Sequence, residues 1–557
     1  MIWPVRCTVK RVKKAKARVR ARSVAHGGED ISKRLSFVLL LLILAATTAN
    51  GSGGKVKNII LVIGDGMGPG QLGLLSAYAR QAPNSIYRQR KNSIEEMIAS
   101  STLGVMLTPP HNGLVVDSAC SATQLSTGRP ANSEVIGIDY QGISAPTILE
   151  LAAKRGMRTG LVTDARITHA TPAAFAAHVP SRHMENRIAQ QLINSQADLL
   201  LGGGARHFIP SNMGAKKFKQ QYPSAPFAVK SKRKDQLNLL AEAKKRGLSL
   251  AFSKQELEQF KGRKLLGLFS KSGMPDGIEE RDNLTDTSRT TPHLAEMAQH
   301  ALRVLSQDSK KGFFLMVEAG QIDWAGHYND VGMMLQEMVK LERTIGAIMR
   351  WAKGRKDTLV VMTADHETGS FGLSYSLYNI PKASAPIAPQ IDPRPYQRNY
   401  NYGDPKVLDK IYQQKRSFIG MLKSIKKLPK KERTVDQLHS IIAPNLSFKV
   451  TKEDIKTLLV KGKNRYYLPG HWGAGKKKVV KICDFAAYYT STSKRMGGVL
   501  GRMLADQQGV VWGTGAHTAT PVLVIAHGPT AATSKFSGLF QTFQVGQRLI
   551  SLLPGNQ

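Results

Sequence analysis

Short apolar runs alternate with helix-patterned segments along most of this chain. Five of the runs have the length of buried strands and are often β-branched, at residues 58–63, 160–163, 313–317, 358–362 and 522–526. Helical patterns lie between them, at residues 146–154, 183–196, 291–306 and 331–351. Strands that are apolar throughout are typical of a parallel sheet buried on both faces. The sequence therefore predicts an α/β fold, with a large, mostly parallel central sheet and helices on both faces.

The alternation stops between residues 373 and 510, where Pro, Tyr, Asn and Lys become frequent. Core-like sequence resumes at Val511. We therefore expect residues 373–510 to be a basic inserted subdomain above the active edge of the sheet. The core would then consist of residues 51–372 and 511–557.

Three local features are expected inside the inserted segment. Residues 381–395 are rich in proline and resemble an extended loop, whereas residues 415–427 have helical potential. His471 and Trp472 are neighbours, and we expect a packed histidine beside the tryptophan rather than part of a site.

The first 50 residues are expected to be a basic leader with a signal peptide. Residues 1–34 carry 11 Lys/Arg and 2 acidic residues, and an apolar stretch follows at residues 35–46. This stretch has the length of a signal-peptide core and falls short of the roughly 20 residues that a membrane span needs. Small residues at 47–49 suit cleavage. The sequence thus predicts an exported protein, periplasmic or secreted.

The mature chain is expected to be strongly basic. Without the leader it keeps 79 − 11 = 68 Lys/Arg and 40 − 2 = 38 Asp/Glu, a net charge of +30. Residues 371–510 hold 26 Lys/Arg and 9 Asp/Glu, so 17 of these charges lie in one quarter of the chain. Such an excess favours contact with a polyanion or an anionic surface, and the alternative is a solvated basic surface. The sequence holds no basic, aromatic-interleaved motif, so we expect no specific nucleic-acid recognition.

Polar side chains follow three of the predicted strands where each strand ends. They are Asp65, Glu318 and the neighbours Asp365 and His366. Ligands collect beyond the carboxyl ends of strands in sheets of this kind, so we expect these side chains to meet at one edge. The glycine-rich turn around Asp65 lacks dinucleotide-binding spacing, because Pro69 stands at the third glycine position. An Asp in this turn suits metal ligation better.

The pair Asp117-Ser118 precedes a run of small residues, and we expect a helix that begins at the serine. Backbone N–H groups at a helix N-terminus attract anions, so this hydroxyl can approach a bound phosphoryl group. No histidine is close in sequence to act as a base, but a metal ion can lower the hydroxyl pKa. Taken alone, the pair would be a simple helix cap.

Further candidate ligands lie in three other places. Asp323 and His327 are four residues apart, which places them on one face of a helical turn. Asp365 and His366 are adjacent, so both reach one site only if the chain turns after the strand. His517 offers another imidazole near the C-terminus.

These blocks resemble the alkaline phosphatase family over residues 57–372 and 511–552. The resemblance also rests on residues 168–172 and on the pair Ser181-Arg182. It implies that Ser118 is the nucleophile and that Arg182 binds the nonbridging phosphate oxygens, which suits a planar bidentate donor.

The resemblance further implies three metal ions, two Zn²⁺ and one Mg²⁺. Its ligands would be Asp323, His327 and His517 for one zinc, Asp65, Asp365 and His366 for the other, and Asp65, Thr171 and Glu318 for magnesium. Nitrogen-containing sets suit zinc, whereas carboxylate and hydroxyl sets suit magnesium. His169 and Trp324 stand where some bacterial members have Asp and Lys, which leaves the identity of the third metal open.

The implied activity is hydrolysis of phosphate monoesters at alkaline pH through a phosphoserine intermediate, by a homodimer. One alternative is a phosphodiesterase of the same superfamily, although an arginine that grips two free oxygens favours monoesters. Another alternative is an exported polyanion-binding protein with an inert phosphatase fold. Sulfatases use Cys or Ser followed by x-Pro-x-Arg, and the residues after Cys120 do not fit. Cys120 and Cys483 also leave one disulfide open.

Overall fold

The computed structural model describes residues 55–483 and 485–555. The predicted leader, residues 1–50, lies outside this part of the chain. Within the described residues, no helix has both the length and the apolar content needed to cross a membrane.

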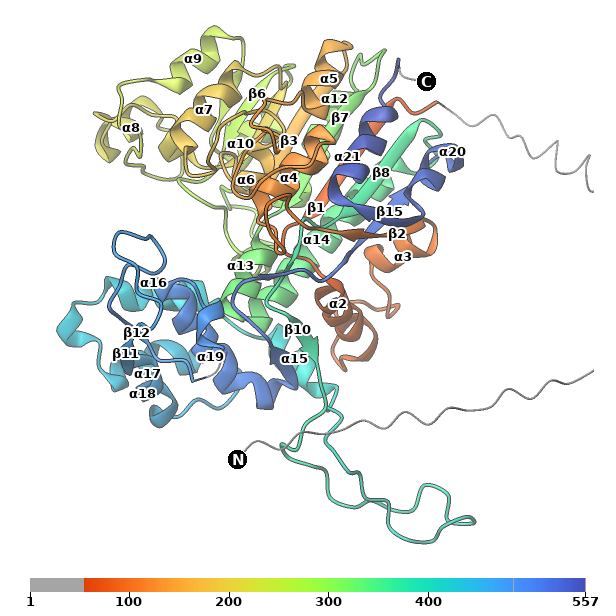
Figure 1. The fold of residues 1–557 in the computed structure, drawn as a ribbon, viewed down its shortest axis with the longest axis vertical. Helices are drawn as coiled ribbons and strands as arrows, with labels where there is room; N and C mark the ends of the chain where they lie inside the picture. Colours follow the sequence, from red (N-terminus) through yellow and green to blue (C-terminus); the bar gives the residue numbers. More distant parts are fainter. Residues whose placement is uncertain (1–54, 484, 556–557) are drawn as a thin grey trace, which may run out of the picture. The chain divides into compact units, whose positions relative to one another are not determined.

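The central sheet has ten strands (Figure 1). In spatial order they are β16 (Gly538–Gln541), β2 (Thr102–Leu107), β15 (Val522–His527), β8 (Thr358–Thr363), β1 (Asn58–Gly64), β7 (Phe313–Ala319), β3 (Arg158–Arg166), β4 (Leu199–Gly203), β6 (Leu265–Leu268) and β5 (Ser249–Ala251). The five predicted strands correspond to β1, β3, β7, β8 and β15. Only β15 runs antiparallel to its neighbours β2 and β8. The prediction of a large, mostly parallel sheet is confirmed.

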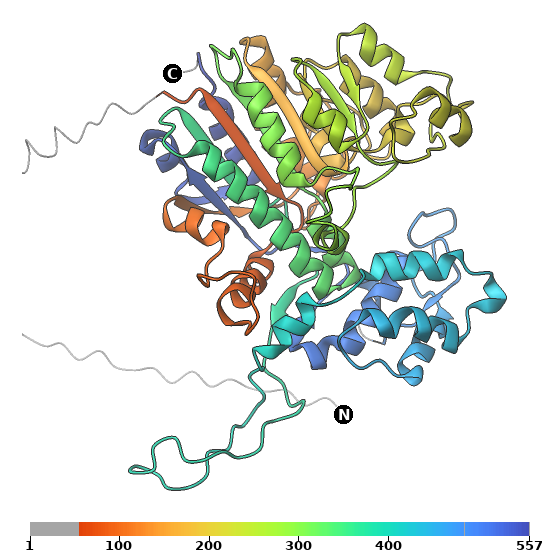
Figure 2. The same cartoon turned by 180° about the vertical axis from the view of Figure 1, so that it is seen from behind.

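Helices cover both faces of this sheet. The helices α12 and α14 pack on one face and are in front in Figure 2, whereas α4, α5, α6 and α21 lie on the other face and are in front in Figure 1. The core helices are α2 (Pro69–Gln81), α3 (Ser93–Ala99), α4 (Ser118–Thr127), α5 (Ile148–Lys154), α6 (Ala170–Ala173), α7 (Glu185–Asn194), α8 (Ala215–Gln221), α9 (Leu239–Lys245), α10 (Lys254–Gln259), α11 (Gly277–Asp282), α12 (Leu294–Ser306), α13 (Gln321–Tyr328), α14 (Val331–Ala352), α20 (Thr530–Thr533) and α21 (Thr542–Ser551). The four predicted core helices are therefore present as α5, α7, α12 and α14.

The middle strands are apolar because helices cover both of their faces. All seven residues of β1 are buried, and its backbone pairs with β7 on one side and β8 on the other. The register places Ile63 of β1 opposite Glu318 of β7 and Thr363 of β8. The chain segments that carry Asp65, Glu318 and Asp365 therefore leave three adjacent strands at the same level, as the sequence predicted.

Residues 373–510 leave and rejoin the core at two paired strands, β10 (Phe371–Leu373) and β13 (Val510–Trp512). The helices and strands between them are α15 (Lys406–Tyr412), α16 (Phe418–Lys427), α17 (Val435–Ile442), α18 (Lys452–Leu459), β11 (Lys461–Lys463), β12 (Lys478–Val480) and α19 (Thr492–Gln508). A second hydrophobic cluster, with members from Phe418 to Leu504, holds most of this segment together. It is tied to the core by Tyr489, whose hydroxyl donates to Asn329 Oδ1 at 3.0 Å.

The local predictions for this segment had different outcomes. Residues 381–395 form an extended loop with one isolated bridge, between Ser384 and Tyr396, and α16 is the helix expected at residues 415–427. The prediction of a packed residue pair was wrong, because the Trp472 side chain is 68% exposed. Glycines at 470 and 473 place this tryptophan in a surface turn. Cys120 and Cys483 are both free thiols, so they form no disulfide.

Candidate active site

Ser118 is the first residue of α4, as predicted, and it is buried. Asp117 caps this helix, since its carboxylate accepts the backbone N–H groups of Ala119 and Cys120. The helix ends at Gly128, whose φ of 65° suits a residue without a side chain. The Ser118 Oγ lies 3.2 Å from His366 Nε2. The serine hydroxyl therefore stands at a helix N-terminus and next to a candidate metal ligand.

Arg182 is held beside this serine by the helix cap. Its Nη1 donates to Asp117 Oδ2 at 2.8 Å, and about a fifth of its side chain is exposed. Burial favours protonation of Asp117, but the neighbouring Arg182 lowers the pKa of this carboxyl below its usual value. The same carboxylate thus orients both the serine helix and the guanidinium group.

Asp323, His327 and His517 form the first group of candidate ligands. Asp323 Oδ1 lies 3.3 Å from the Nε2 atom of each histidine, and the two Nε2 atoms are 3.2 Å apart. The Nδ1 atom of His327 lies 2.8 Å from the carbonyl of Gly515, and that of His517 lies 2.8 Å from the carbonyl of Val116. These contacts use Nδ1 as a donor, so both Nε2 atoms are free to bind a cation.

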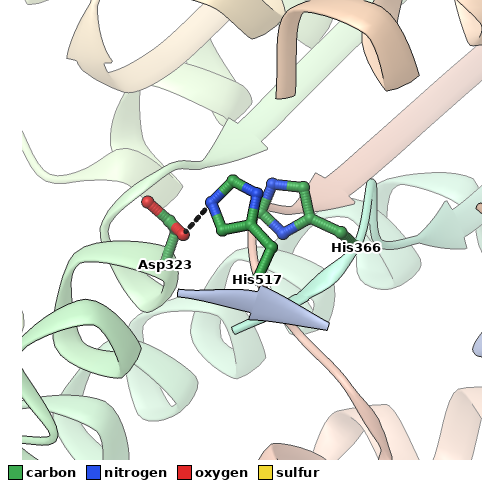
Figure 3. A group of neighbouring side chains, drawn as sticks. All are labelled: Asp323, His366 and His517. Atoms are coloured by element: carbon green, nitrogen blue, oxygen red, sulfur yellow. Dashed lines mark ion pairs between the residues drawn. The ribbon is translucent and has the colours of Figure 1, made fainter. Parts of the chain in front are cut away.

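The sequence separation between His517 and the other ligands is bridged by a short strand pair. β14 (His517–Thr518) pairs antiparallel with β9 (Glu367–Thr368), which places the His517 ring against the His366 ring with centroids 3.6 Å apart. Figure 3 shows Asp323 and His517 joined by their ion pair, with His366 beside them. Asp365 and His366 both lie in the turn between β8 and β9, which is the chain reversal that their adjacency required.

Asp65, Asp365 and His366 form the second group. The Nε2 of His366 lies 3.6 Å from Asp65 Oδ1 and 3.3 Å from Asp365 Oδ2. The turn that carries Asp65 depends on Gly66, which has a φ of +77° and would place a Cβ 2.6 Å from the Cα of Asp323. A glycine is therefore required where the first two groups meet.

Asp65, Glu318 and His169 form a third group, with ligand atoms within 4.8 Å of one another. The hydroxyl of Thr163 donates to one Glu318 oxygen. His169 lies edge-on to the Trp324 ring, with centroids 6.1 Å apart. Asp65 belongs to the second and third groups, and His366 links the second group to Asp323 and His517 of the first, so the three groups make up one continuous site.

Several buried polar atoms of this site have no hydrogen-bond partner among the described residues. They are both carboxylate oxygens of Asp65, Oε1 of Glu318, Oδ2 of Asp365, Oγ1 of Thr171 and Nδ1 of His169. Buried polar atoms are normally satisfied, and burial of unpaired carboxylates is costly. The donor set of carboxylates, one hydroxyl and imidazoles therefore fits bound cations.

The electrostatics of the site lead to the same conclusion. Burial, followed by repulsion from Asp365, raises the pKa of Asp65 well above its usual value. Burial also raises the pKa of Glu318 to about 8 and that of Asp365 to about 6. Burial lowers the pKa of His327 to about 3 and holds that of His366 well below its usual value, so both rings are neutral and able to ligate.

A cavity of about 1210 Å³ opens over Ser118 and Arg182, and it is lined by a lysine that the sequence did not single out. Lys494 lies in the first turn of α19, inside the inserted segment. Burial lowers the pKa of Lys494 to about 8, while Asp323 acts in the opposite direction. No sequence motif surrounds Lys494. Its position in the cavity lining follows from the packing of α19 against α13, which the sequence does not indicate.

The family model for alkaline phosphatase matches residues 56–431 of this chain. The chain belongs to the alkaline phosphatase family. Alkaline phosphatase 3 of Bacillus subtilis (strain 168) is 36% identical over 340 residues, which are 59% of this chain and 65% of that protein. The alkaline phosphatase of Escherichia coli (strain K12) is 31% identical over 352 residues, 56% of this chain and 70% of that protein. The chain thus spans a little less than two thirds of the Bacillus relative.

Solved alkaline phosphatases share this fold. The cold-active enzyme from the psychrophile Shewanella sp. gives a TM-score of 0.62 at 26% identity, over 89% of this chain and 100% of that chain. The Thermus thermophilus alkaline phosphatase gives a TM-score of 0.70 at 24% identity, over 91% of this chain and 92% of that chain. The resemblance seen in the sequence is confirmed as family membership.

The structure gathers the side chains that the sequence assigned to an alkaline phosphatase site. They are Asp65, Ser118, His169, Thr171, Arg182, Glu318, Asp323, Trp324, His327, Asp365, His366 and His517. His366 lies within ligand distance of two sets of side chains, Asp323 with His517 and Asp65 with Asp365. The individual roles of these residues stay predictions.

Proposed function

We propose that this protein hydrolyses phosphate monoesters at alkaline pH and releases an alcohol and inorganic phosphate. The observation that carries the proposal is the position of Ser118 beside a buried cluster of imidazoles and carboxylates, several of whose oxygens have no hydrogen-bond partner among the described residues. A hydroxyl at a helix N-terminus with an arginine beside it suits attack on a phosphoryl group. Family membership supports the same reaction.

We propose two zinc ions and one magnesium ion for this cluster. Asp323, His327 and His517 would hold the first zinc, Asp65, Asp365 and His366 the second, and Asp65, Thr171 and Glu318 the magnesium. When bound, these ions supply positive charge that lowers the pKa of a nearby hydroxyl and stabilises the transferring phosphoryl group. His169 lies within ligand distance of Asp65 and Glu318, so its imidazole would be a further ligand available to the third ion.

The chain's own residues would divide the reaction into two displacements. Ser118 Oγ attacks phosphorus in line, and the bond from phosphorus to the ester oxygen breaks. Arg182 holds two nonbridging oxygens with its planar fork, and the N–H groups of α4 favour their negative charge. A water molecule then attacks the phosphoserine, which breaks the bond from phosphorus to Oγ and returns the free serine.

Two alternatives are less well supported. A phosphodiesterase must accept a second ester group, whereas the guanidinium of Arg182 is placed to pair with two free oxygens. An inert polyanion-binding protein would have no need of the unsatisfied carboxylate oxygens, which lower stability unless cations bind them.

The test is turnover of a chromogenic aryl phosphate by the mature protein. We expect activity at alkaline pH, loss of activity with a chelator and recovery with zinc plus magnesium. Ser118→Ala should lower kcat by roughly a thousandfold or more without loss of metal. Ser126→Ala is the matched control, since Ser126 lies on the same helix and its hydroxyl donates to the carbonyl of Ala174 at 2.7 Å. Equal turnover by the Ser118 variant and the control would refute the nucleophile.

We also propose, from the leader pattern of residues 1–50, that the mature protein is exported and, from family resemblance, that it forms a homodimer. N-terminal sequencing of the secreted protein tests the cleavage near residue 49, and light scattering tests the dimer.

A further inference from the structure

The cavity over Ser118 is larger than a phosphoryl group alone requires. Its volume of about 1210 Å³ exceeds the roughly 300–1,000 Å³ of a typical small-molecule pocket. The Ser118 end of the cavity lies in the core, whereas its outer part is lined by α16 and by other residues of the inserted segment. The outer part is therefore available to the alcohol portion of a substrate.

Cations dominate the lining of this outer part. Six of the cationic side chains that line the cavity make no ion pair with a carboxylate among the described residues: Lys271, Arg416, Lys423, Lys426, Lys427 and Lys494. The carboxylates that line the cavity outside the metal cluster and without an arginine partner are fewer: Glu134, Asp276 and Glu279. The cavity therefore carries excess positive charge next to the phosphoryl site.

The fold of α16 explains why its lysines face the cavity. Lys423, Lys426 and Lys427 are three and four residues apart, so they share one face of the helix and are exposed. The opposite face, with Phe418, Met421, Leu422 and Ile425, is buried in the second hydrophobic cluster. This burial fixes the rotation of the helix and keeps the lysine face turned toward the cavity.

The lysines also lie close enough to repel one another. Burial, followed by Lys476 and Lys423, lowers the pKa of Lys426 below its usual value. Like charges held together without counter-charges are relieved when an anion binds. A cluster of this kind next to a phosphoryl site is suited to a second anionic group of the same substrate.

We propose that Lys423, Lys426 and Lys427 of α16 form a second anion subsite, and that the preferred substrates are phosphate monoesters whose alcohol carries at least one further phosphate group. This inference rests on the proposed phosphatase activity. One phosphoryl group is bound at Ser118 and Arg182, and the second is bound by the lysine face of α16.

The test uses pairs of substrates that differ only in the second phosphate. An alkanediol monophosphate and the bisphosphate of the same diol are compared over a series of chain lengths, and kcat/KM is measured for each. For the native protein we expect a higher kcat/KM for the bisphosphate at a matching chain length. This preference should shrink as salt is added, because the subsite is open to solvent.

Removal of the lysine charges on α16 tests whether these side chains cause the preference for the bisphosphate. In Lys423→Gln/Lys426→Gln/Lys427→Gln, the ratio of kcat/KM for bisphosphate over monophosphate should fall roughly tenfold, as expected for the loss of three solvent-exposed charge contacts. The control is Lys430→Gln/Lys431→Gln/Lys463→Gln, which removes the same charge from exposed lysines of the same segment outside the cavity lining. The control should keep the native ratio.

Each other outcome overturns the inference. An unchanged ratio in the α16 variant refutes the subsite. An equal fall of the ratio in both variants means that the total positive charge of the inserted segment, rather than a local subsite, causes the preference. If heparin binding weakens while the ratio stays constant, the cluster binds long polyanions instead. If the native protein turns over no ester, the proposed function fails separately, and calorimetry with an alkane bisphosphonate then decides whether the α16 lysines bind a second phosphate-like group.

Discussion

Replacement of Lys340 by Met tests the buried ion cluster beneath the active site. Lys340 lies on α14 and is almost fully buried, with its Nζ 2.8 Å from Asp164 Oδ2 and 2.6 Å from Glu337 Oε2. Asp164 Oδ1 also accepts the backbone N–H of Gly320 at 2.6 Å, at the turn between Glu318 and α13. This lysine therefore balances a carboxylate that holds the chain between two candidate metal ligands.

The magnitude follows from the charge that the substitution leaves behind. Burial raises the pKa of Glu337 to about 8, so this carboxyl is largely protonated at pH 7 and Asp164 is the main counter-charge of Lys340. Without Lys340, the buried carboxylate of Asp164 keeps no cationic partner among the described residues. A buried pair that loses one partner is typically destabilised by about 3–5 kcal/mol, because the remaining charge stays buried without compensation.

The assay is urea unfolding of both proteins at pH 7 with the metal ions present. We expect Lys340→Met to lower the free energy of unfolding by about 3–5 kcal/mol, because the substitution leaves the Asp164 carboxylate buried without its cation. Asp164→Asn in the same chain should recover part of the loss, since the amide oxygen still accepts from Gly320. Lys353→Met, at the exposed C-cap of the same helix, is the control. A loss below about 1 kcal/mol at pH 7 would refute this reasoning.

Two further substitutions test the site itself. Arg182→Lys should lower kcat/KM for an aryl phosphate roughly 10–100-fold with metal content unchanged, because an ammonium group lacks the bidentate fork. Thr368→Val removes the hydroxyl that donates to Asp323 Oδ1 at 2.7 Å, and we expect zinc affinity, measured by competition with a chelating dye, to fall roughly 10–100-fold. Native zinc affinity in the Thr368 variant would show that this hydroxyl does not orient the ligand.

The middle of the sheet could be predicted from the sequence because burial on both faces leaves a strong local signal. β1 is apolar along its whole length, and the polar residues Asp65, Glu318 and Asp365 mark the ends of adjacent strands. Strand β2, between the edge strand β16 and β15, was not predicted, because its residues alternate between buried and exposed and include Gly104. The antiparallel direction of β15 depends on the path of the chain through the inserted segment, which no local pattern encodes.

The site was predictable where ligands lie within one turn or one strand end, and not where distant segments meet. Asp323 and His327 were recognisable from helical spacing. Lys494 was not, because it reaches the cavity only through the packing of α19 against α13. The exposure of Trp472 was also missed, since the flanking glycines indicate a turn but not which way its side chain points.

The antiparallel pairing of β10 with β13 allows the inserted segment, which lines the outer part of the cavity, to change without moving the core residues around Ser118. Closing a loop between two ends that are already hydrogen-bonded costs little extra chain entropy as the loop grows. Sequence between these strands can therefore lengthen, shorten or change its charge while Ser118 and the candidate metal ligands keep their positions in the core.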